Sequence, residues 1–261
     1  MTQTPATTTS YAPGEPNWVD VMSPDVAAST AFYHGVFGWN ALELGEDAGG
    51  YVMFELGGSI AAAVGPLQEG AHPAWMVYFN SVDVDATAAS VTAAGGQVVA
   101  PPFDVLDQGR MAVFADPTGA FFSVWQPMKM PGLGIKGEPN TYGWCELNTR
   151  GVDRAAEFYK SVFGWDAHLA SGSQEGVPYT EWQLGGRSFG GAIDMANVGL
   201  PAEMPPHWLV YFNTADIQVA VARVAELGGK VMMEPTDYPG GRFAVVADPV
   251  GCAFGLMISD S

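Results

Sequence analysis

The chain has 261 residues, of which 48% are hydrophobic and 12% aromatic, so it has the composition of a globular protein with room for two domains. Its formal net charge is −18, with 28 acidic and 10 basic residues, which argues against binding nucleic acids or anionic membranes, because both attract cationic surfaces. The sequence contains no secretory signal and no run of about 20 apolar residues, so we expect a cytoplasmic protein without membrane-spanning segments.

The first half of the chain alternates strand and helix patterns. Residues 1–13 are Thr-rich and are expected to form a disordered tail ahead of a first module at residues 14–127. In this module we expect a helix at 26–36 that ends at Gly38 in the left-handed conformation. A second helix is expected at 82–94. The expected strands lie at 17–22, 40–44, 50–56, 59–64, 74–80, 97–103 and 109–126, the last range being a hairpin.

The second half repeats the first. A linker rich in proline and glycine at residues 128–139 leads into a second module at residues 140–258. The repeated stretches are the helix end F-Y-x-x-V-F-G-W at 32–39 and 158–165, V-Y-F-N at 77–80 and 210–213, and the hairpin G-R…D-P-x-G at 109–119 and 241–251. A repeat of this length indicates two copies of one domain, because solenoid repeats are about 20–50 residues long.

The repeated hairpin turns at Asp116 in the first copy and at Asp248 in the second. An Asp side chain in such a turn is expected to accept hydrogen bonds from the backbone amides, and the following glycine is free to take a positive φ. Because the stretch occurs once in each module, we interpret it as a scaffold element rather than a catalytic one.

These motifs, in order and twice, resemble the vicinal-oxygen-chelate superfamily of glyoxalase I, extradiol dioxygenases and bleomycin-resistance proteins. The resemblance covers residues 14–127 and 137–258. It implies an α+β fold of two tandem modules, each made of paired βαβββ units that form a cupped, barrel-like mixed sheet with outer helices. Modules of this family commonly pair, and two fused modules can satisfy that pairing within one chain, so we expect a monomer or a homodimer.

The resemblance also implies a metal site that this chain does not reproduce. Enzymes of the family usually hold a divalent metal with His, Glu or Gln from the first and last strands of their units. By alignment these positions carry Trp18, Met76 and Ser123 in the first module, and Trp144, Leu209 and Gly255 in the second. Such side chains are poor ligands for a divalent ion, so we predict no metal site and no cofactor.

Strand alternation places further side chains on the same face as these positions. Each cup would be lined by aromatic rings and thioethers together with a carboxylate, a phenol and an amide, which is typical of a pocket for an organic ligand. The predicted ligand-binding residues are Trp18, Asp20, Met76, Tyr78, Asn80, Ser123 and Trp125 in the first module, and Trp144, Glu146, His207, Leu209, Tyr211, Asn213 and Met257 in the second.

Several interpretations of these residues stay open. The aromatic side chains could simply fill the cups. The inward carboxylates, Asp20 and Glu146, could bind a cation or hydroxyl of a ligand, or act as general bases with a raised pKa. They could also pair with the arginine of their own module, Arg110 or Arg242, because a buried carboxylate is costly without a partner.

We predict a metal-free protein that binds a hydrophobic or aromatic small molecule, including a cationic one. The protein would sequester this natural product or drug, as bleomycin-resistance proteins do, or act as an accessory to its biosynthesis. The alternative is an enzyme of the glyoxalase-like lyase, isomerase or hydroxylase type. In that case Asp20 or Glu146 would be the catalytic base, and Tyr78 or Tyr211 would steer a substrate oxygen.

Overall fold

The computed structural model describes residues 10–45, 48–170 and 177–259. The first module contains β1 (Pro16–Ser23), α1 (Val26–Phe37), β2 (Asn40–Glu43), β3 (Val52–Leu56), β4 (Ser59–Pro66), β5 (Ala74–Asn80), α2 (Val84–Ala93), β6 (Gln97–Val105), β7 (Gly109–Ala115) and β8 (Phe121–Pro127). The second contains β9 (Tyr142–Thr149), α3 (Val152–Phe163), β10 (Asp166–Leu169), β11 (Tyr179–Leu184), β12 (Arg187–Asp194), β13 (His207–Asn213), α4 (Ile217–Glu226), β14 (Lys230–Tyr238), β15 (Gly241–Ala247) and β16 (Ala253–Ser259).

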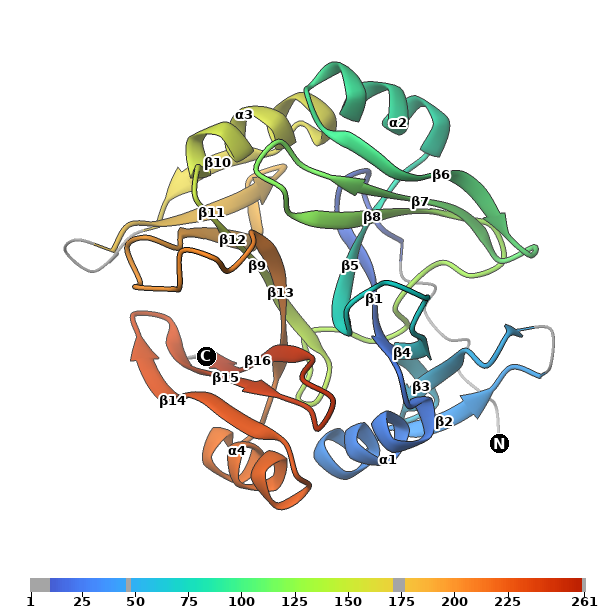
Figure 1. The fold of residues 1–261 in the computed structure, drawn as a ribbon, viewed down its shortest axis with the longest axis vertical. Helices are drawn as coiled ribbons and strands as arrows, with labels where there is room; N and C mark the ends of the chain where they lie inside the picture. The colour runs from blue at the N-terminus through green and yellow to red at the C-terminus, as the bar shows by residue number, and fades with distance from the viewer. Residues whose placement is uncertain (1–9, 46–47, 171–176, 260–261) are drawn as a thin grey trace.

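The strands that the structure describes form two eight-stranded sheets, one in each module (Figure 1). Their orders are β2-β3-β4-β1-β5-β8-β7-β6 and β10-β11-β12-β9-β13-β16-β15-β14. Within each sheet the two βαβββ units meet at an antiparallel pair, β1 with β5 or β9 with β13, whereas β4 with β1 and β5 with β8 are parallel. The sheets are therefore mixed and cupped, which confirms the predicted α+β fold of two tandem modules.

Local sequence sets both ends of the first helix, and the end at Gly38 is as expected. Asp25 caps α1, since its Oδ1 accepts a hydrogen bond of 2.9 Å from the amide of Ala28. Gly38 ends the helix with φ of 72°, and Gly164 ends α3 in the same way with φ of 71°. None of the helices that the structure describes has the length and apolar character needed to cross a membrane.

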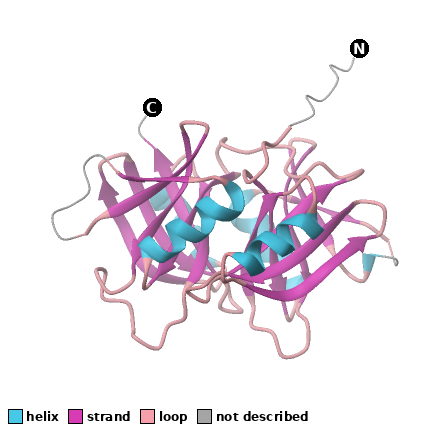
Figure 2. Cartoon of the chain, turned by 90° about the horizontal axis from the view of Figure 1, so that it is seen from above, coloured by secondary structure: helices cyan, strands magenta, loops and turns pink. Residues whose placement is uncertain are grey.

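The two modules lie side by side (Figure 2), and their helices pack in pairs, α1 beside α4 and α2 beside α3 (Figure 1). The tryptophan that follows each first helix is completely buried at this boundary. The indole nitrogen of Trp39 donates to the Asn140 carbonyl at 2.7 Å, and that of Trp165 donates to the Gly14 carbonyl at 3.0 Å. The boundary between the modules is therefore part of the hydrophobic core.

The Asp-Pro-x-Gly turn of each module is held by a tyrosine from the other module. Oδ1 of Asp116 accepts backbone hydrogen bonds within its own turn, while Oδ2 accepts one of 3.1 Å from the Tyr159 hydroxyl. In the second copy, Oδ2 of Asp248 accepts one of 3.0 Å from Tyr33. The predicted bonds to backbone amides are thus present, and the scaffold role extends to joining the modules.

The segments outside the sheets also make specific contacts. Of the predicted tail, residues 1–9 lie outside the described residues, whereas the Tyr11 hydroxyl donates to the Leu133 carbonyl at 2.7 Å. Leu133 belongs to the segment that joins the modules, and its side chain is only 1% exposed. The connection between β8 and β9 therefore packs on the first module.

Candidate functional site

The strand register places the predicted side chains in matching rows on the two cups. In the first cup the neighbouring pairs are Trp18–Tyr78, Tyr78–Ser123, Asp20–Met76 and Asn80–Trp125. In the second cup they are Trp144–Tyr211, Tyr211–Gly255, Glu146–Leu209 and Asn213–Met257, with His207 beside Asn148. The two sets therefore occupy the same places in the repeated fold.

A buried carboxylate lies at the centre of the first cup. Oδ2 of Asp20 accepts hydrogen bonds from the hydroxyls of Tyr51 at 2.7 Å and Tyr78 at 2.9 Å, and the Tyr51 oxygen accepts one of 3.1 Å from Nε1 of Trp18. Asp20 is only 2% exposed, and this burial raises its pKa to about 6, although the hydroxyl donors oppose the shift. Its Oδ1 has no hydrogen-bond partner in the described part of the chain.

The second cup repeats this cluster around Glu146. Its Oε1 accepts hydrogen bonds from the Tyr211 hydroxyl at 3.2 Å and from Nδ2 of Asn148 at 3.3 Å. Nε1 of Trp144 donates to the Tyr179 oxygen at 2.9 Å, and Tyr179 in turn bonds the carboxylate. Burial raises the pKa of Glu146, and the surrounding hydrogen bonds act against that shift.

One tyrosine in each cluster, Tyr51 or Tyr179, was not among the predicted site residues. Tyr51 lies immediately before β3, and Tyr179 is the first residue of β11. Both are outside the strands whose side chains were predicted to line the cups. A repeated pattern could have identified them, because Y-x-x-[FW]-x-L-G-G occurs at residues 51–58 and again at 179–186. Each carboxylate thus faces two phenols where the sequence predicted one.

The suggested pairing of the inward carboxylates with arginine is wrong. Arg110 binds Asp85 at 2.9 Å and Asp104 at 2.8 Å, and Arg242 binds Asp237 at 2.9 Å. Strand alternation explains the outcome for β7, where Met111 pairs with Trp125 of the cup and the adjacent arginine points to the opposite face. The tyrosine hydroxyls, rather than guanidinium groups, stabilise the carboxylates.

The first cup is the more closed of the two, although Met76 and Tyr51 are half-buried. The predicted floor residues Trp18, Tyr78, Ser123 and Trp125 are all buried, and Nε1 of Trp125 donates to the Met130 carbonyl at 2.9 Å. This bond ties the segment after β8 to the cup. Asn80 is also engaged, since its amide group donates to the carbonyls of Tyr11 and Ala12 and accepts from Asn17.

The second cup is more open. Leu209 and Tyr211 are buried, but most of the cluster is half-buried, namely Trp144, Glu146, Tyr179, Asn213 and Met257. The flexible side chain of Met257 takes the place of the Trp125 indole. Glu146 is therefore partly exposed to solvent, whereas Asp20 is not.

His207 lies two residues from Leu209 on β13 and is half-buried. Its Nδ1 is 3.0 Å from the Pro205 carbonyl, and burial lowers the pKa of the imidazole. The ring is thus favoured in its neutral form beside Asn148, which itself donates to Glu146.

The positions that the family resemblance assigns to a metal do not fit one. In the second cup a Cβ atom at Gly255 would lie 2.0 Å from Cδ1 of Tyr211, so the Tyr211 ring fills the space that a ligand side chain would need. In the first cup the corresponding residue is Ser123, with Trp18 in the same row. The described residues also contain no group of three or more His, Cys, Asp or Glu side chains that could hold an ion. That the protein works without a metal stays a prediction.

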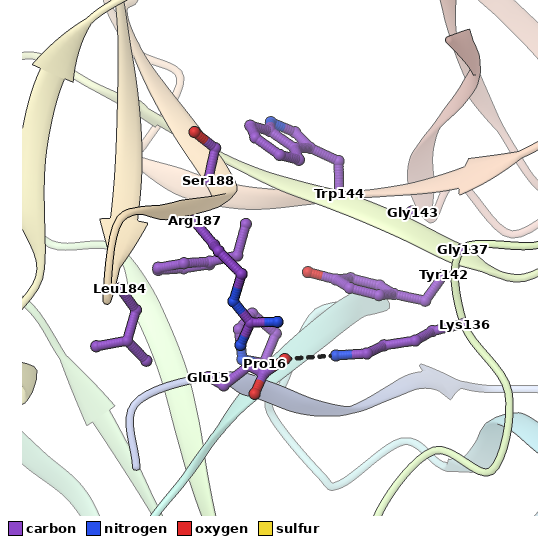
Figure 3. A pocket seen from close by; sticks show the side chains of 11 residues that line it. Glu15, Pro16, Lys136, Gly137, Tyr142, Gly143, Trp144, Leu184, Arg187 and Ser188 are labelled. Carbon is purple, nitrogen blue, oxygen red and sulfur yellow. Dashed lines mark hydrogen bonds and ion pairs between the residues drawn. The ribbon is translucent and has the colours of Figure 1, made fainter. Parts of the chain in front are cut away.

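A cavity of about 310 Å³ lies at the start of β9, with Trp144 in its wall (Figure 3). Tyr142, Leu184, Ser188 and Phe189 contribute to its walls. The ion pair between Lys136 and Glu15, 2.7 Å long, lies at its edge. Neither Glu146 nor Tyr211 lines this cavity.

Comparison with known proteins agrees with the geometry of the two modules. The sequence matches the Glyoxalase/Bleomycin resistance protein/Dioxygenase superfamily over residues 15–124 and 141–256, and the chain belongs to this superfamily. Both predicted modules are therefore members of one family, as the internal repeat indicated.

Two curated relatives carry names that refer to one biosynthetic class. The chain is 41% identical to the anthracycline biosynthesis protein DnrV of Streptomyces peucetius and 40% identical to DauV of Streptomyces sp. (strain C5), in each case over 95% of this chain and 94% of the relative. Among solved structures, the Mn(II)-bound glyoxalase from Novosphingobium aromaticivorans superposes with a TM-score of 0.66 at 18% identity, covering 94% of this chain and 82% of that one. At that identity the likeness concerns the fold.

Proposed function

We propose that this protein binds a flat, hydrophobic small molecule in the cup of its second module and serves the biosynthesis or sequestration of that molecule. The observation that carries the proposal is the difference between two copies of one cluster. In the Trp–Tyr–carboxylate–Tyr arrangement, the tryptophan and the carboxylate are buried in the first module, as Trp18 and Asp20, and half-buried in the second, as Trp144 and Glu146. A ligand that uses this arrangement can reach the second copy.

The side chains around Glu146 suit an aromatic ligand. The Tyr211 ring lies 6.3 Å from that of Phe243, which lies 6.0 Å from Tyr238, so a row of rings extends from the carboxylate toward β14. Such rings provide contact area for a planar molecule, while the carboxylate accepts a hydrogen bond from a ligand hydroxyl or ammonium group. The net charge of −18 favours a cation over an anion.

The names of the relatives point to the same ligand chemistry. DnrV and DauV are named for the biosynthesis of anthracyclines, which are flat, aromatic polyketides. We therefore propose a polycyclic aromatic natural product, with an amino group or hydroxyl directed at Glu146, as the ligand class.

Isothermal titration calorimetry with an anthracycline that carries an amino sugar, and with its aglycone, tests the proposal. We expect binding of the amine-bearing compound to weaken about 10- to 100-fold in Glu146→Gln, because a hydrogen bond to a charged group contributes about 1.5–3 kcal/mol. The matched change in the first cup, Asp20→Asn, should leave the affinity unchanged. Equal losses in both variants, or no binding of either compound, would count against the proposal.

A second candidate is an enzyme that uses Glu146 as a general base. The observation in its favour is that burial raises the pKa of this carboxyl, which lies between two phenols that could steer a substrate oxygen. Conversion of a bound ligand by the wild type but not by Glu146→Gln, with binding retained, would favour the enzyme. The assays are run with and without added Ni, Zn, Fe or Mn, alongside metal analysis of the purified protein.

A further inference from the structure

The segment between the modules occupies a groove beside β1 and β4 of the first module. The amide of Leu133 donates to the Asn17 carbonyl at 2.9 Å, and the amides of Gly134 and Ile135 donate to the Ile60 carbonyl at 2.7 and 3.2 Å. The contact is close, since a Cβ atom at Gly132 would lie 2.3 Å from the Asn17 oxygen. The chain thus binds a short extended piece of itself, with the Leu133 side chain buried.

The second module contains the same groove. β1 pairs with β4 at Asp20–Ala63, and β9 pairs with β12 at Glu146–Gly191, so Gly143 corresponds to Asn17 and Ser188 corresponds to Ile60. The β3–β4 and β11–β12 hairpins agree with this assignment. Leu56 pairs with Ser59 in the first hairpin, and Leu184 pairs with Arg187 at the same place in the second.

In the second module this groove is the cavity of about 310 Å³ described above (Figure 3). Its walls include Gly143, Leu184 and Ser188, the counterparts of residues that contact or adjoin residues 132–135 in the first module. Within the described residues, no group outside the strand ladder donates to the carbonyl of Gly143 or of Ser188. The acceptors that residues 132–135 use in the first groove are therefore available in the second.

Two side chains in this cavity also lack partners. The Tyr142 hydroxyl is buried and, apart from a weak contact with the Cys145 thiol, has no hydrogen-bond partner in the described part of the chain. Figure 3 shows this hydroxyl directed into the cavity. Arg187 replaces Ser59 at the edge, and no described carboxylate forms an ion pair with it. Both groups could serve an occupant.

We infer that this groove binds an extended peptide, or a peptide-like amide, that carries a branched apolar side chain. The side chain enters where Leu133 enters the first groove, and consecutive N–H groups donate to the carbonyls of Gly143 and Ser188. A carboxylate that follows them faces Arg187, by analogy with the chain direction of residues 132–135 along Ile60. This site adjoins the cup at Trp144, which contributes to both, whereas Glu146 and Tyr211 do not line it.

The sequence of residues 131–135 supplies the probe, acetyl-Pro-Gly-Leu-Gly-Ile with a free carboxylate, titrated into the full-length protein and followed by NMR and by Trp fluorescence. We expect saturable binding with a Kd of about 0.1–1 mM, since a short flexible peptide loses much conformational freedom on binding. N-methylation of the Leu and second Gly amides should weaken binding at least about 10-fold, because it removes two of the three donors.

The matched protein variants are Ser188→Phe, which adds a large ring to the wall of the groove, and Thr236→Phe, which adds the same ring to an exposed position on β14. Binding should be lost in the first and unchanged in the second. No saturable response below about 10 mM peptide, or equal binding of the N-methylated peptide, would overturn the inference; that comparison uses the wild-type protein and holds even if a variant fails to fold. A failure of the peptide to bind would not change the outcome expected for calorimetry of Glu146→Gln, so the two proposals can be tested separately.

Discussion

Replacing Asp20 with asparagine should stabilise the protein, and the gain should grow with pH. The pKa of this carboxyl is about 6 in the folded protein, against an ordinary value of 3.8, because burial disfavours the charged form. A carboxyl whose pKa rises on folding binds more protons in the folded state, so stability is lost as the pH rises from about 4 to 6, and the cost is constant above that range.

The two values differ by about two units, which corresponds to roughly 3 kcal/mol at full ionisation. Part of this cost is already present at pH 5, so the wild type should lose about 1–2 kcal/mol relative to Asp20→Asn between pH 5 and pH 8. The amide retains an oxygen that can accept the hydrogen bonds of Tyr51 and Tyr78, so packing should change little.

Urea unfolding of both proteins at pH 5, 6, 7 and 8 measures the difference. Asp85→Asn is the matched control, because that carboxylate is exposed and paired with Arg110, and it should leave the pH profile of the wild type almost unchanged over this range. A stability difference between wild type and Asp20→Asn that does not vary with pH would refute the reasoning.

The remaining predictions concern the module boundary, the family's metal position and the open cup. Tyr33→Phe and Tyr159→Phe should each destabilise the protein by about 1–3 kcal/mol in urea unfolding, because each leaves a buried carboxylate oxygen of the other module without its donor. Unchanged stability would contradict a stabilising role for these tyrosine–aspartate hydrogen bonds between the modules. Gly255→Ser should cost about 1–3 kcal/mol or more through overlap with the Tyr211 ring, whereas wild-type stability of this variant would show that the ring can move aside. Calorimetric affinity for a cationic ligand should fall as the pH is lowered through the raised pKa of Glu146, and an unchanged affinity would separate the carboxylate from binding.

Much of the fold was predictable because the local signals occur twice. The helix end at Gly38 returns at Gly164, and each Asp-Pro-x-Gly turn bonds its own amides, as the sequence indicates. The sequence did not reveal that Tyr33 and Tyr159 reach the turn of the opposite module. That contact depends on how the modules pack, which strand and helix periods do not encode.

The residues that line the cups could be predicted from the sequence, but whether each cup is open to solvent could not. Strand alternation placed Trp18, Asp20 and Tyr78 on one face, and the register agrees. Whether the matching cups are open depends on segments outside the cup strands, such as residues 128–135, which follow β8 and lie beside Trp125. The periodic patterns that identify strands and helices carry no information about such segments. The predicted pairing of Asp20 with Arg110 was wrong for a local reason, since the side chains of Arg110 and Met111 point to opposite faces of β7.

The central claim is that ligand binds at the second cup and not at its more closed copy in the first. Quenching of intrinsic Trp fluorescence by an anthracycline, compared between Trp144→Phe and Trp18→Phe, tests this most directly, because the two residues occupy the same place in the repeat. We predict that the saturable quench is largely lost in Trp144→Phe and retained in Trp18→Phe. Loss in Trp18→Phe with retention in Trp144→Phe would contradict the assignment.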